Sequence, residues 1–107
     1  MFESLLKRVN EHHLIKPLFP SIPLIIACES KHSKCYFQLD IEGLKCMETA
    51  PETVHLKMTG NDGQMKDLLT GQLKLQQLME LKAIKVEGTF RDILRLEAIL
   101  SLAADHS

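Results

Sequence analysis

The clearest pattern in the sequence is a run of alternating apolar and polar residues near its centre. The apolar members of the run are Cys35, Phe37, Leu39 and Ile41, and each is followed by a polar or amphipathic residue. Strict alternation places successive side chains on opposite faces of a strand. The pattern therefore predicts a strand over 35–42 with one buried face and one face in water.

Three neighbouring segments predict further strands with short turns between them. The segments are 24–28, 44–48 and 54–59. Serine, glycine and proline residues between these segments favour turns. Four consecutive strands joined in this way predict an antiparallel meander with one covered face.

Helical spacing of apolar residues dominates the rest of the chain. The predicted helices cover 2–16, 61–70, 73–81 and 89–103, and a fifth strand over 84–87 precedes the last of them. Asn61 with Gln64, and Thr89 with Asp92, have the spacing of helix-capping pairs. The order helix, four strands, two helices, strand, helix indicates the α+β class.

Composition and charge narrow the possible functions. The chain has 107 residues, 45% of them hydrophobic, and 14 acidic against 13 basic side chains. One globular domain over 1–107 is expected, with no general attraction to nucleic acid. The longest apolar run is far shorter than the roughly 20 residues that cross a bilayer, so stable membrane insertion is not expected. Three cysteines without a secretory signal predict reduced thiols and a cytoplasmic location.

No catalytic or metal-binding arrangement stands out. The serines lack a Gly-x-Ser-x-Gly setting, and the cysteines Cys28, Cys35 and Cys46 fall on strands where a small buried side chain fits. His12 and His13 are adjacent on a helix and cannot face one metal ion together. We therefore expect no enzyme, no cofactor and no metal.

The last third of the chain has more apolar side chains than one helix stripe needs. The final helix carries apolar residues around much of its circumference, and the two helices before it add leucines and methionines. This surplus fits a large core or a dimer face. It also fits an apolar tunnel filled by a lipid chain.

The C-terminal half resembles the lipid-binding domain of the sterol carrier protein 2 family. The resemblance rests on Val54-His-Leu-Lys-Met-Thr-Gly60, Met65-Lys-Asp-Leu-Leu-Thr-Gly-Gln-Leu73 and Ala83-Ile-Lys-Val-Glu-Gly88, in that order and spacing. It implies a five-stranded, mainly antiparallel sheet with helices packed on one face. It also implies non-catalytic carriage of a fatty acid, fatty acyl-CoA or sterol-like molecule between sheet and helices.

On this hypothesis the ligand contacts the sheet and the helical layer. The expected apolar lining comprises Phe37, Leu39, Leu56, Met58, Met65, Leu69, Leu73, Met79, Phe90 and Leu94. Arg91 and Arg95 share a helix face and are candidates for an anionic head group, whereas a surface ion pair of Glu87 with Arg91 is the alternative. A different function, protein interaction or homodimerisation through the apolar helices, also fits the pattern.

Overall fold

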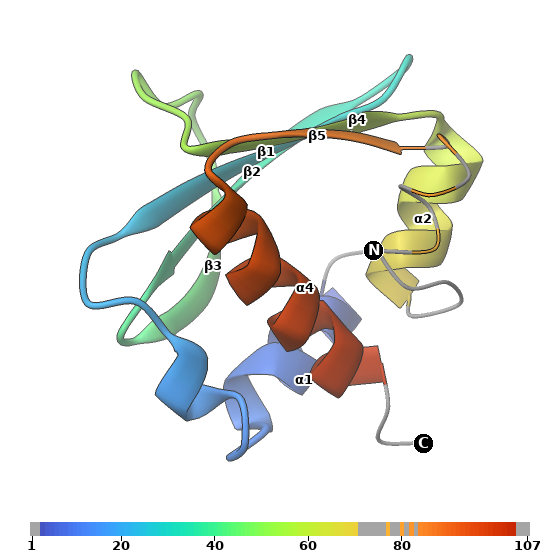
Figure 1. Cartoon of the computed structure of the whole chain (residues 1–107). Helices are drawn as coiled ribbons and strands as arrows, with labels where there is room; N and C mark the ends of the chain where they lie inside the picture. Colours follow the sequence, from blue (N-terminus) through green and yellow to red (C-terminus); the bar gives the residue numbers. More distant parts are fainter. Residues whose placement is uncertain (1–2, 71–76, 78–79, 81, 83, 105–107) are drawn as a thin grey trace.

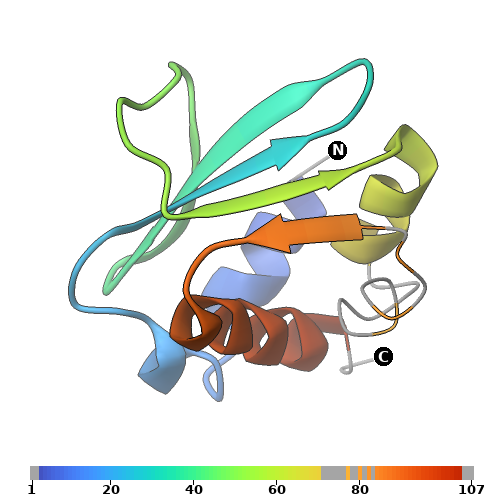
Figure 2. The ribbon, with the colours of Figure 1, turned by 45° about the horizontal axis from the view of Figure 1, so that its top comes forward.

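The computed structural model describes residues 3–70, 77, 80, 82 and 84–104. Within these residues, a five-stranded sheet is covered on one face by helices (Figure 1). Helix α4 (Phe90–Ala104) runs along this covered face, and α1 (Glu3–Glu11) lies beside it (Figure 2). Helix α2 (Asp62–Thr70) contacts α1 and one strand of the sheet. The predicted α+β class, with helices on one face, is confirmed.

The sheet contains strands β1 (Leu24–Glu29), β2 (Lys34–Asp40), β3 (Gly43–Met47), β4 (Leu56–Gly60) and β5 (Ile84–Glu87). Their order is β3-β2-β1-β4-β5, and every neighbouring pair is antiparallel except β1 with β4. The predicted four-stranded meander is therefore wrong. The chain returns after β3 and places β4 beside β1, where it pairs the backbone groups that a three-stranded meander would leave exposed.

Helix α1 is shorter than the predicted 2–16. It ends at Glu11, and the imidazole Nδ1 of His12 accepts a hydrogen bond from the Leu14 backbone N–H at 3.2 Å. A 3₁₀ helix, η1 (Lys16–Leu18), follows, with Pro17 in its first turn. Proline fits there because the first turn of a helix leaves its N–H groups unbonded.

Asn10 attaches α1 to the edge of the sheet. Its side-chain amide donates to the Leu44 carbonyl at 2.9 Å, and its carbonyl accepts from the Leu44 N–H at 2.7 Å. Both hydrogen bonds use backbone groups at the start of β3, which is an edge strand. This contact therefore protects part of an edge that could otherwise pair with another chain.

Both predicted N-caps are confirmed. The Asn61 carboxamide oxygen accepts from the Gln64 N–H at 2.7 Å at the start of α2. At the start of α4, the Thr89 hydroxyl accepts from the Asp92 N–H at 3.2 Å. Each cap satisfies one of the free N–H groups of a first helical turn.

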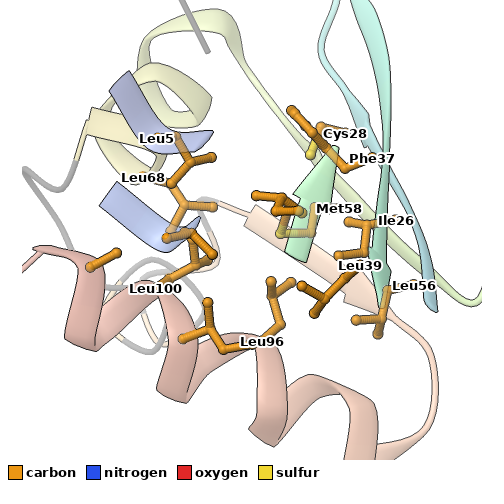
Figure 3. Close-up of a cluster of buried hydrophobic side chains, with 14 of the residues drawn as sticks. Leu5, Ile26, Cys28, Phe37, Leu39, Leu56, Met58, Leu68, Leu96 and Leu100 are labelled. Atoms are coloured by element: carbon orange, nitrogen blue, oxygen red, sulfur yellow. The ribbon is translucent and has the colours of Figure 1, made fainter. Parts of the chain in front are cut away.

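The core lies between the covered face of the sheet and α1, α2 and α4. Figure 3 shows its side chains converging from both layers, with Leu96 and Leu100 of α4 opposite Leu39 of β2 and Met58 of β4. Among the described residues, no polar or charged residue is fully buried. A molecule that enters the core would therefore contact apolar side chains and would find no buried polar side chain for a hydrogen bond.

The three cysteines occupy different environments. Cys28 is buried, Cys35 is half-buried and Cys46 is exposed, so the expectation of packing at all three positions is wrong for Cys46. Cys46 lies on β3, an edge strand of the sheet, where its side chain remains open to solvent. Cys28 and Cys35 are direct cross-strand neighbours. The Cys35 thiol donates to the Cys28 carbonyl oxygen at 3.8 Å. Interaction with the Cys35 side chain, followed by burial, raises the pKa of Cys28, and interaction with the Cys28 side chain lowers the pKa of Cys35.

These environments predict an order of thiol reactivity. With a polar disulfide reagent in the native protein, Cys46 is expected to react first, Cys35 more slowly and Cys28 only on unfolding. Access limits Cys28, and its raised pKa reduces the reactive thiolate further. Timed labelling followed by peptide mass spectrometry measures the order. Early labelling of Cys28 would contradict it.

Candidate functional site

A small apolar cavity lies between the sheet and the helices. It measures about 20 Å³, close to the size that holds one water molecule, and its lining offers no polar partner to such a water. Side chains from α1, α4 and the strands β1, β2, β3 and β4 form the wall. They are Leu5, Val9, Ile26, Cys28, Phe37, Leu39, Leu44, Met58, Leu96, Ile99 and Leu100. The cavity is therefore a dry space inside the core.

The predicted lining residues divide into four groups. Phe37, Leu39 and Met58 line the cavity, and Leu56 and Met65 are buried in the surrounding core. Leu73, Met79 and the side chain of Leu69 lie outside the described residues.

The two remaining predicted residues do not reach the interior. Phe90 and Leu94 are exposed on α4. The inward stripe of α4 consists of Leu96, Ile99 and Leu100, and a helix with 3.6 residues per turn places 90 and 94 on its outer side. The prediction that Phe90 and Leu94 line the cavity is therefore wrong.

Sequence reasoning missed the contribution of α1 and β1 to the wall. Leu5 and Val9 of α1 are buried against the core, and Ile26 of β1 lies in the central strand. The four-residue spacing of Leu5 and Val9 already indicated an apolar helix stripe. What the stripe faced could not be known without the strand order.

A second, larger pocket is open to solvent at the start of α4. It has a volume of about 250 Å³ and is lined by Pro20, Ser21, Ile22, Pro23, Leu24, His55, Arg91, Asp92 and Arg95. These residues come from the loop before β1, the first residue of β1, the loop before β4 and the first turns of α4. The structure thus brings the two candidate head-group residues, Arg91 and Arg95, to one pocket.

His55 is held in place by two hydrogen bonds to Ile25. The His55 N–H donates to the Ile25 carbonyl at 2.9 Å, and the imidazole Nδ1 accepts from the Ile25 N–H at 2.9 Å. Because Nδ1 is an acceptor, the proton of the neutral ring is on Nε2. His55 therefore brings a hydrogen-bond donor, and no negative charge, to the pocket.

The arginines bring positive charge to the same pocket. Within the described part of the chain, neither Arg91 nor Arg95 lies within 4 Å of a carboxylate oxygen in an ion pair. The alternative partner of Arg91, Glu87, instead binds Lys85 Nζ at 3.0 Å. Two guanidinium groups against the single carboxylate of Asp92 give the pocket a net positive charge, which favours an anion.

In the part of the chain that the structure describes, no cluster of three or more histidine, cysteine or acidic side chains is arranged for a metal ion. No described helix combines the length and hydrophobicity needed to span a bilayer.

Comparison with known proteins gives a consistent result. The model of the SCP-2 sterol transfer family matches residues 3–101. A curated relative, the SCP2 domain-containing protein YusD of Bacillus subtilis (strain 168), is 34% identical over 92 residues, which are 86% of this chain and 81% of the relative.

Solved structures match the fold as well. The sterol carrier protein domain 2 of Helicoverpa armigera superimposes with a TM-score of 0.72 at 17% identity, over 99% of this chain and 87% of the other. Palmitated SCP2L2 from Aedes aegypti gives a TM-score of 0.59 at 12% identity, over 92% of each chain. At these identities the two structures show the shared fold alone.

Proposed function

The chain belongs to the SCP-2 sterol transfer family, and from this membership we propose that residues 1–107 form one lipid-binding domain that carries a fatty acid, fatty acyl-CoA or sterol-like molecule. The proposed role is carriage without catalysis, in the cytoplasm and without nucleic acid. The observation that supports it most directly is the wholly apolar wall between the sheet and α1 and α4.

The apolar wall suits a hydrocarbon chain energetically. Each methylene group moved from water into such a wall contributes about 0.8 kcal/mol. A buried hydroxyl or carboxylate would gain no hydrogen bond from the lining side chains and would carry its desolvation cost. We therefore assign the tail of the ligand to the core and its polar end to the surface.

The present cavity is a closed form of the proposed site. A volume of about 20 Å³ is far below the roughly 300–1,000 Å³ of a typical small-molecule pocket. If a cavity of several hundred Å³ stayed empty, the side chains of its walls would lose their dispersion contacts. Without ligand, these side chains therefore pack against one another. On this proposal, the lipid separates α4 and α1 from the sheet and replaces those contacts.

The pocket at the start of α4 is proposed to hold the polar end. Arg91, Arg95 and His55 bring cationic and neutral donors to it. Leu24 lines the same pocket at the first position of β1, and Ile26, two residues along the strand, lines the apolar cavity. An anionic lipid with its tail in the core would thus have donors near its head group.

Native mass spectrometry and a fluorescent fatty-acid probe test the carrier function together. We expect co-purified lipid or, after delipidation, saturable probe binding near one molecule per chain that unlabelled fatty acid competes away. Ligand should also raise the melting temperature, because it binds the folded chain preferentially. A delipidated, folded protein that binds neither fatty acid, acyl-CoA nor sterol would overturn the proposal.

The head-group assignment predicts a selective loss in Arg95→Glu. Affinity for a fatty acid should fall about fivefold, since exposed charge interactions contribute about 1 kcal/mol, while affinity for the matching fatty alcohol stays constant. The difference should shrink at high salt because the pocket is open to solvent. Competition against the probe measures both affinities.

Lys31→Glu is the matched control for this charge change. Lys31 is exposed in the turn between β1 and β2, whereas the pocket lies at the end of the sheet where β1 begins. The control should bind both ligands like the wild type. If Arg95→Glu changed the affinities for fatty acid and fatty alcohol equally, Arg95 would not be part of the head-group site. The proposal that the apolar wall binds the tail would still stand.

A further inference from the structure

Large apolar side chains are exposed on two of the elements that line the polar pocket, the loop before β1 and the start of α4. Ile22, in the loop that lines the pocket, is 77% exposed, and Phe90, at the start of α4, is 75% exposed. Leu94, one turn further along α4, is 48% exposed. Apolar side chains gathered in this way, beside polar ones, are typical of a surface that contacts a partner.

The geometry of α4 places apolar and cationic side chains next to each other. Phe90 and Leu94 are four residues apart and form one stripe on the outer side of the helix. Arg91 and Arg95 form the adjoining stripe, about 100° further around the axis. The start of α4 lies at the edge of the helical layer in Figure 2, and the chain before β1 runs past the same end of the molecule.

We propose that the surface formed by Ile22, Phe90, Arg91, Leu94 and Arg95, called the docking surface below, binds anionic lipid bilayers peripherally. The apolar side chains would enter the boundary between head groups and acyl chains, and the arginines would remain at the phosphates. The proposal goes beyond carriage of a lipid, because it identifies where the protein meets the membrane that supplies or receives it.

Charge favours a bilayer over a second copy of the chain. A two-fold dimer formed through this surface would place four arginines in one interface, and the docking surface contains no acidic side chain to pair with them. An anionic bilayer instead presents opposite charge beside apolar volume, so both stripes of α4 gain favourable contacts. The docking surface would then bring the mouth of the polar pocket against the head groups.

Vesicle flotation tests the docking surface directly. Wild-type protein should float with phosphatidylcholine vesicles that contain phosphatidylglycerol, and binding should weaken in high salt. Phe90→Ser/Leu94→Ser should lower the partition coefficient about tenfold through lost apolar insertion. Arg91→Glu/Arg95→Glu should lower it by a similar factor on anionic vesicles only.

Two controls share the chemistry of these changes but lie outside the docking surface. Leu14→Ser removes a leucine that is 58% exposed in the turn after α1, and Lys31→Glu reverses a charge in the turn after β1. Both should float like the wild type. Circular dichroism and melting temperature show whether each variant is folded, and exposed substitutions of this kind rarely destabilise by more than about 0.5 kcal/mol.

The outcomes separate docking from carriage. Phe90→Ser/Leu94→Ser should still bind the fatty-acid probe in solution, because neither side chain lines the cavity. The docking proposal alone is overturned if the wild-type protein binds the probe but does not float at low salt. It is also overturned if Phe90→Ser/Leu94→Ser floats as well as the wild type. A concentration-dependent dimer that the same double variant abolishes, without any vesicle binding, overturns it as well. Flotation without probe binding overturns carriage and leaves docking in place.

Discussion

Leu96→Trp is expected to weaken fatty-acid binding on the order of fiftyfold while the protein remains folded. Leu96 projects from α4 into the cavity, opposite the sheet (Figure 3). An indole there would occupy the space of roughly three methylene groups of ligand, each worth about 0.8 kcal/mol. The added bulk should cost stability only about 1–3 kcal/mol, since over-packing in a core is partly absorbed by neighbouring side chains.

Leu96→Met provides the matched control. It nearly conserves volume and keeps a flexible apolar side chain at the same position, so both affinity and stability should stay close to the wild type. Probe titration and thermal unfolding of the three proteins decide the outcome. Undiminished binding by a folded Leu96→Trp protein would show that the tail does not lie between α4 and the sheet.

Gly88→Ala should produce the largest loss of stability, about 3 kcal/mol or more. Gly88 joins β5 to α4 with φ of +153°, a region that residues with a side chain rarely adopt. A Cβ atom would overlap the Leu56 side chain and lie 2.8 Å from the His55 carbonyl oxygen. A fall in melting temperature on the order of 10–20 °C is expected for a domain of this size.

Gly63→Ala makes the same chemical change without the strain. Gly63 is in α2, and an added Cβ would lie 3.6 Å from the nearest side-chain atom, Asn61 Oδ1, an ordinary contact. Alanine there should leave stability unchanged or raise it by up to about 1 kcal/mol. Similar melting temperatures for the two variants would mean that the chain at Gly88 can relax without cost.

Local structure could be predicted well from the sequence. The alternation around Phe37 predicted β2 with Phe37 and Leu39 buried, and side-chain spacing predicted the caps at Asn61 and Thr89. The alternation was wrong for Ile41, which lies in the turn after β2 and is exposed. These features depend on neighbours within about four residues. The family was also recognised from three short segments whose order and spacing match, and the family comparison confirms it.

Features that depend on distant residues could not be predicted in the same way. The parallel pairing of β4 with β1 joins segments about thirty residues apart, and no local pattern distinguishes it from a meander. The outward position of Phe90 depends on which side of α4 meets the sheet. Likewise, Arg95 and His55 share a pocket only because β4 and β5 bring their flanking loops together.

The strand order also determines the sequence in which the sheet can be completed during synthesis. Strands β1, β2 and β3 are joined by short hairpins and can pair as soon as they leave the ribosome. The central strand β1 then keeps one open edge until Leu56–Gly60 has been made. The nascent chain consequently passes through a stage in which Ile26 and its neighbours could pair with another nascent chain, and rapid arrival of β4 ends that risk.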